Sequence, residues 1–139
     1  MFRLCLFYTL SAAIEKKDVN RQDALLEELH TLARIYPDDV AVRQWLARGL
    51  FNMLVEVNLE EDLGRRDVLL DELRALAKAY PDDVRVRYEL AMSLYNTIVI
   101  LELHEDLKHR QSLVEELRTL ANSNPDDAML RELLTEACR

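Results

Sequence analysis

The chain has 139 residues, which is enough for one domain. Half of its residues are apolar and 32% are charged, a balance typical of a folded chain rather than a disordered one. Its 18 basic and 26 acidic residues give a net charge of −8, which argues against non-specific binding to nucleic acid or to an anionic membrane. No apolar run approaches the roughly 20 residues needed to span a bilayer.

The tripeptide Pro-Asp-Asp occurs three times, and its copies are 44 residues apart. When residues 37–80 are aligned with residues 81–124 without a gap, 22 of the 44 positions are identical. Residues 1–36 and 125–139 continue the same register as partial copies. The sequence therefore predicts a single repeat domain that consists of two complete repeats between two partial ones.

Each repeat is expected to hold two helices. A shortened first helix is expected over residues 1–16, and complete first helices over residues 40–60 and 84–104, where apolar side chains recur at helical spacing. The second helix is clearest over residues 62–80, and its apolar stripe recurs one repeat before and one repeat after. A last, shortened first helix is expected over residues 126–138.

The prolines and aspartates between the repeats define the helix ends. Proline disfavours helical geometry in the residue before it, so Pro37, Pro81 and Pro125 are each expected to end a second helix. The two aspartates that follow are expected to cap the next first helix. Seven helices joined in this way predict an all-α fold, an α-solenoid of stacked antiparallel helix hairpins.

The sequence resembles the tetratricopeptide repeat family. Its repeat of 44 residues is longer than the family's repeat of about 34 residues. The resemblance rests on Leu-Ala-Lys-Ala-Tyr-Pro-Asp-Asp at 76–83 and Tyr-Glu-Leu-Ala-Met-Ser-Leu-Tyr at 88–95. The chain departs from the family where Arg43, Arg87 and Arg131 replace an early aromatic residue. HEAT-like repeats have a similar period, which leaves the packing detail open. The resemblance implies a non-enzymatic scaffold that binds a peptide or protein surface on the face lined by the first helices.

The first helices also carry a distinctive set of residues opposite their core stripe. In the second complete repeat this side is unusually apolar, and we expect it to bind a partner. The candidate residues are Gln44, Arg48, Asn52, Arg85, Tyr88, Met92, Asn96 and Val99. The alternative is that the long helices overlap and bury these residues between neighbouring repeats. For Asn52 and Asn96 the alternative is a structural hydrogen bond between helices.

No motif for catalysis, phosphate binding or metal binding is found, so we expect no enzymatic activity, no cofactor and no metal site. Cys5 and Cys138 lie near opposite ends of the sequence, which is typical of reduced intracellular thiols, and a cytoplasmic location is expected. Residues 1–13 faintly resemble a secretory signal, but they align in register with a first helix.

A second hypothesis is a structural one, in which the chain associates with itself through its ends. Terminal repeats usually present a polar outer face, but the first residues are rich in Leu, Phe and Tyr, and residues 125–139 lack a second helix. The ends would then pack against another copy, or the chain would be a fragment of a longer array. Under this hypothesis, polar substitutions at Leu6 and Phe7 disperse the oligomers.

Overall fold

The computed structural model describes residues 10, 12–13, 19–57 and 63–139. Within these residues the chain forms six helices and no strand, which confirms the predicted all-α class. The helices are α2 (Val19–Ile35), α3 (Val40–Glu56), α4 (Leu63–Ala79), α5 (Val84–Leu103), α6 (Leu107–Ser123) and α7 (Ala128–Ala137). The helix expected over residues 1–16 lies largely outside the described residues.

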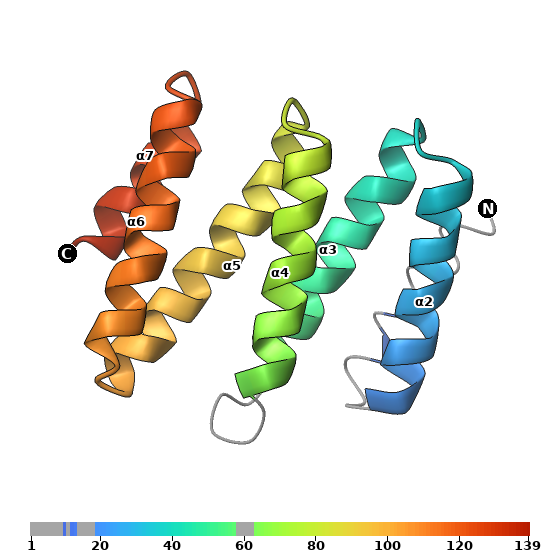
Figure 1. The fold of residues 1–139 in the computed structure, drawn as a ribbon, viewed down its shortest axis with the longest axis horizontal. Helices are drawn as coiled ribbons and strands as arrows, with labels where there is room; N and C mark the ends of the chain where they lie inside the picture. The colour runs from blue at the N-terminus through green and yellow to red at the C-terminus, as the bar shows by residue number, and fades with distance from the viewer. Residues whose placement is uncertain (1–9, 11, 14–18, 58–62) are drawn as a thin grey trace.

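The six helices form two rows, and consecutive helices run in opposite directions (Figure 1). The first-helix row contains α3, α5 and α7, and the second-helix row contains α2, α4 and α6. Neighbours in the first-helix row are in direct contact, and each helix also contacts the helices next to it in sequence. In the second-helix row, by contrast, no Cα atoms of α2 and α4, or of α4 and α6, come within 8 Å of each other in the described part of the chain.

Aspartate side chains cap the N-termini of the first helices, as predicted. The second aspartate of each Pro-Asp-Asp motif caps a first helix, because its carboxylate accepts a hydrogen bond from a backbone N–H in the first turn. These caps are Asp39, Asp83 and Asp127, and Asp106 does the same for α6. The first helix expected over residues 40–60 is shorter in the structure, since α3 ends at Glu56 and the next residue is extended.

The core lies between the two rows and is built from the predicted stripes. In the second-helix row Leu29, Leu73 and Leu117 occupy the same position in successive repeats, and each is fully buried. Leu50 and Leu94 play the same part in the first-helix row. Leu76 and other residues near the ends of the second helices are partly buried against this core.

Two of the three arginines that recur at one repeat position, Arg43 and Arg87, form ion pairs between neighbouring first helices. The Arg43 Nε atom lies 2.7 Å from Asp83 Oδ2, and Arg87 Nη2 lies 3.2 Å from Asp127 Oδ2. The Arg43 guanidinium also lies 4.3 Å from the centre of the Tyr80 ring. Burial alone would raise the pKa of Asp83, but its hydrogen bonds from Arg43 and the helix backbone lower it, so the cap is charged.

Candidate functional site

The first-helix face is the outward side of α3, α5 and α7. Its central feature is a stripe of apolar side chains along α5, defined by Tyr88, Met92, Val99 and Leu103, which follow one another at helical spacing. Val99 is 38% exposed and Leu103 is 77% exposed. Tyr88 is half-buried, and Met92 packs partly against the core. The structure thus combines the two sequence-based interpretations, because one end of the stripe is open and its middle is partly covered.

A buried carboxylate lies within this face. The side chain of Glu89 has no exposed surface, and its Oε1 atom lies 3.4 Å from Arg48 Nη1 and 3.2 Å from Arg85 Nε. Its Oε2 atom is buried and has no hydrogen-bond partner. Burial raises the pKa of Glu89, while the two arginines act in the opposite direction. Because Arg48 and Arg85 share a single anion and are 41% and 49% exposed, this part of the face carries a net positive charge.

Sequence reasoning did not predict this buried charge. Trp45 and Leu133 occupy the position of Glu89 in the neighbouring repeats. Because the other repeats carry large apolar residues at this position, alignment of the repeats could have indicated that the Glu89 side chain is buried. Both arginines are among the sequence-based candidates for partner binding, and the structure places both against Glu89.

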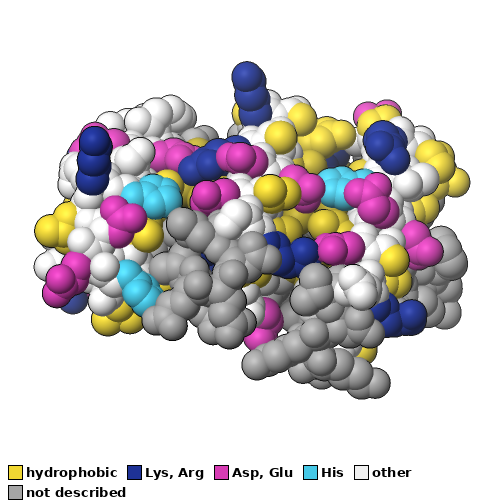
Figure 2. All heavy atoms as spheres, turned by 60° about the horizontal axis from the view of Figure 1, so that its bottom comes forward, with side chains coloured by type: hydrophobic (Ala, Val, Ile, Leu, Met, Phe, Trp, Pro, Cys, Tyr) yellow, Lys and Arg dark blue, Asp and Glu magenta, His cyan; other side chains and the backbone are white. Residues whose placement is uncertain are grey.

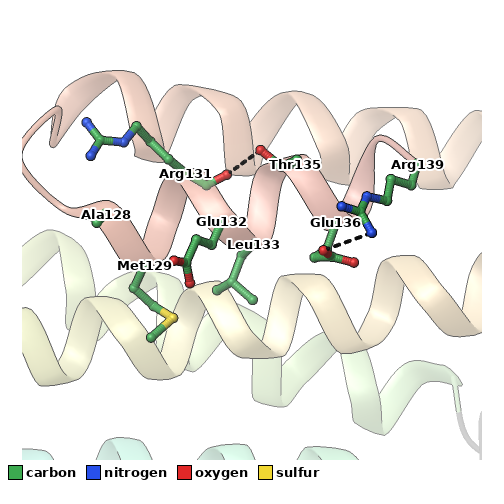
Figure 3. A pocket seen from close by; sticks show the side chains of 8 residues that line it. All are labelled: Ala128, Met129, Arg131, Glu132, Leu133, Thr135, Glu136 and Arg139. Atoms are coloured by element: carbon green, nitrogen blue, oxygen red, sulfur yellow. Dashed lines mark hydrogen bonds and ion pairs between the residues drawn. The ribbon is translucent and has the colours of Figure 1, made fainter.

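One hollow lies beside the apolar stripe, and a second lies along α7. The first has a volume of about 610 Å³ and is lined by three of the candidate residues, Gln44, Arg85 and Tyr88, together with Met129 of α7. The second has a volume of about 510 Å³ and follows α7, where Met129 and Glu132 lie on the same side of the helix (Figure 3). The α7 residues of these hollows were absent from the sequence-based candidates.

The two candidate asparagines have a different setting. Asn96 Oδ1 accepts a hydrogen bond from Arg66 Nη2, which is the structural alternative considered for this residue. Arg66 is completely buried, and it also donates to Thr97 Oγ1 at 3.2 Å and to the Leu54 carbonyl at 3.0 Å. Burial lowers the pKa of Arg66 to about 10. Asn96 is therefore engaged in a network that joins three helices, and Asn52 is half-buried on α3.

The opposite side of the molecule is charged. Side chains of both signs lie next to one another across the second-helix row (Figure 2). The His30 ring lies 3.2 Å from Glu72, and Arg74 makes two hydrogen bonds of 2.8 Å to Glu116. Both pairs join residues 42 positions apart, so they bridge the same gap between successive second helices. The hydrogen bond to Glu72 raises the pKa of His30.

Several sequence-based predictions concern residues that the structure does not describe. Cys5, Leu6 and Phe7 lie outside the described residues, so self-association through the amino-terminal end stays a prediction. In the described part of the chain, no three His, Cys, Asp or Glu side chains are grouped so that they could hold a metal ion. Of the described helices, none has both the length and the apolar character that a bilayer span requires.

The site on the first-helix face thus consists of an apolar stripe, the hollow beside it and a pair of arginines on a buried carboxylate. This arrangement offers contact area and fixed charges. Comparisons of the chain with protein-family models, with curated proteins and with solved structures give no match.

Proposed function

We propose that the chain is a non-enzymatic protein–protein interaction module whose first-helix face binds a peptide or protein surface. The observation that carries this proposal is the apolar stripe on α5. Burial of exposed apolar surface by a partner contributes about 25 cal/mol for each Å² removed from water, so the open end of the stripe at Val99 and Leu103 favours association. Methionine adapts its shape to different partners, which suits Met92 at the centre of the stripe.

The architecture that we propose for the module is an α-solenoid of 44-residue hairpins similar to tetratricopeptide repeats. Its support is the recurrence of equivalent contacts between successive repeats. The pair of Arg43 with Asp83 is repeated by Arg87 with Asp127, and both pairs join residues 40 positions apart. A stack built from equivalent joints presents one continuous face, and that face is the first-helix row.

Arg48 and Arg85 would orient the bound partner. Each keeps part of its guanidinium exposed while Glu89 holds it in place, so the side chains are positioned before a partner arrives. Pre-positioned charges lose less conformational freedom on binding than freely rotating ones. They also make the interaction selective for partners that place a negative group at this end of the stripe.

Selection of peptides from a random displayed library against the immobilised chain tests this proposal. We expect the selected peptides to bind the unmodified chain and to lose at least about tenfold in affinity with Met92→Glu combined with Tyr88→Ala. Val68→Glu is the matched control, since Val68 is an exposed apolar residue on α4. Circular dichroism establishes that all variants are folded.

Two results would contradict the proposal. One is a selection that yields no peptide for the folded chain. The other is a set of peptides whose affinities are unchanged by Met92→Glu with Tyr88→Ala but reduced by Val68→Glu, which would place binding on the second-helix row.

A further inference from the structure

The hollow of about 610 Å³ lies between the first turns of α5 and α7. Its apolar lining includes Val84, Tyr88 and Met129, and the side chains of Val84 and Met129 are exposed to solvent. The capping carboxylates of Asp83 and Asp127 also line it, but each of them is paired with an arginine of the preceding first helix. Because these two charges are already neutralised, the hollow is suited to a large apolar side chain.

An excess of positive charge lies on one side of this hollow. Arg48 reaches from α3, and Arg85 from the first turn of α5, to the same carboxylate, that of Glu89. The two arginines thus share one negative charge, and both side chains are partly exposed. Arg85 also lines the hollow itself, so the excess charge lies next to the apolar lining.

An excess of negative charge lies on the other side. Glu132 and Glu136 of α7 are exposed and lie on the same side of the helix as Met129 (Figure 3). Glu136 pairs with Arg139 at 3.4 Å, so the charge of Glu132 remains in excess. Arg131 does not change this balance, because its side chain points away from Met129 (Figure 3). The charge therefore changes from positive to negative across the hollow.

The first-helix face also curves inward. Neighbouring helices of this row are in direct contact, whereas Cα atoms of neighbouring second helices do not come within 8 Å of each other in the described part of the chain. The row with the closer spacing lies on the inside of the curve. A single segment of polypeptide can follow such a surface, while a flat protein surface meets only its rim.

We propose that the occupant of the first-helix face is a short extended segment of a partner protein, in which an acidic, a large apolar and a basic residue follow one another from α3 to α7. This inference rests on the proposed function, because it names the partner of the same face. The acidic residue meets Arg48 and Arg85, the apolar residue enters the hollow, and the basic residue meets Glu132.

The width of the helices sets the spacing of these residues. The arginine pair lies between α3 and α5, and Glu132 lies on α7. Axes of packed helices are about 8–10 Å apart. An extended chain advances about 3.3 Å per residue, so the acidic and basic residues of the segment lie about three to five positions apart, with the apolar residue between them.

Sequencing of the peptides that the immobilised chain selects from a random displayed library is the first test. Compared with the unselected library, we expect enrichment of peptides in which an acidic and a basic residue flank a large apolar residue at this spacing. We also expect their affinity to decrease when salt is added, because both charged contacts are exposed to solvent.

Exchange of one charge gives a sharper test, with a synthetic peptide of the selected sequence as the probe. Glu132→Lys is expected to raise its dissociation constant about tenfold, as measured by fluorescence polarisation. Replacing the basic residue of the peptide by glutamate is expected to restore binding to this variant. Glu28→Lys is the matched control, since it makes the same change of charge on the exposed side of α2.

The positive side of the hollow is tested separately. Arg85→Gln leaves Arg48 and Glu89 as a neutral pair, and we expect it to weaken binding severalfold. The effect is expected to disappear when the acidic residue of the peptide is replaced by alanine, which a purely structural defect would not produce. Circular dichroism establishes that both variants are folded.

Three results would overturn this inference. The first is a selected set of peptides without this order of charges, and the second is an affinity that neither Glu132→Lys nor Arg85→Gln changes. In both cases, binding that still depends on Met92 would leave the proposed function standing. The third is a dimer of the chain that Met92→Glu disrupts, which would assign the face to a second copy instead.

Discussion

The first-helix row and the second-helix row differ in how neighbouring helices meet. Helices α3, α5 and α7 touch directly, and the ion pairs between them use buried carboxylates such as those of Glu89 and Asp83. Helices α2, α4 and α6 stand farther apart, and long charged side chains such as Arg74 and Glu116 span the gaps. The same repeat unit therefore produces close helix contacts with buried carboxylates in one row, and wider gaps bridged by half-exposed ion pairs in the other.

This difference explains where the unusual polar groups lie. Direct contact between first helices removes water, so each polar side chain caught between them needs a partner inside the protein. Glu89 and Arg66 are such side chains, and both have shifted pKa values because of burial. On the second-helix row water remains next to the charges, and the ion pairs there are screened. Four experiments sharpen the comparison, from the largest expected effect to the smallest.

Truncation of the core shared by both rows has the largest expected effect. Leu73 on α4 is fully buried, and Leu73→Ala removes its contacts and leaves a cavity. We expect the free energy of unfolding to fall by about 2–5 kcal/mol. Chemical denaturation followed by circular dichroism measures this change, and an unchanged denaturation midpoint would contradict the assigned core.

Removal of the buried arginine comes second. Arg66→Ala leaves the Leu54 carbonyl and the Asn96 side chain without their donor, and we expect a loss of about 1–3 kcal/mol. Arg65→Ala is the matched control, because Arg65 is only half-buried and pairs with Asp23 on the second-helix row. We expect the control to lose less than about 1 kcal/mol. Equal losses in the two variants would contradict the special cost of removing the buried arginine.

The ion pair of the second-helix row has a smaller effect. A double-mutant cycle with Arg74→Ala and Glu116→Ala isolates its contribution from the other contacts of each residue. We expect a coupling energy below about 1 kcal/mol that decreases when salt is added. A coupling energy of about 3 kcal/mol that salt does not change would show that this ion pair is shielded from solvent like a buried pair.

The pair of His30 with Glu72 has the smallest effect and depends on pH. Because folding raises the pKa of His30 above the ordinary value of 6.5, its contribution to stability is complete below 6.5. The contribution disappears as the pH rises through the pKa of the folded state. Unfolding measured on both sides of this range is expected to show this dependence in the unmodified chain and a flatter profile in His30→Gln. An equal dependence in both proteins would assign it to other groups.

Much of this fold was predictable from local patterns. The interval between the Pro-Asp-Asp motifs predicted the division into repeats, and helical spacing predicted buried residues such as Leu50 and Leu73. The capping role of Asp83 was predictable because it depends on residues next to it in sequence. Of the candidate site, Tyr88 and Val99 lie on one side of α5, because positions on a helix follow from its period, and their part in binding stays a prediction.

The remaining features depend on neighbours that are far apart in sequence. That Arg66 is buried follows from the approach of α5, which brings Asn96 and Thr97 to its guanidinium from about 30 positions away. That Arg48 is held by a carboxylate follows from the contact between α3 and α5. By itself, the sequence determined the repeat length, the helices, their caps and the residues of the core, because these depend on short-range periodicity. Only the tertiary structure decided which charges are buried and which face stays open, because burial depends on the distance between helices.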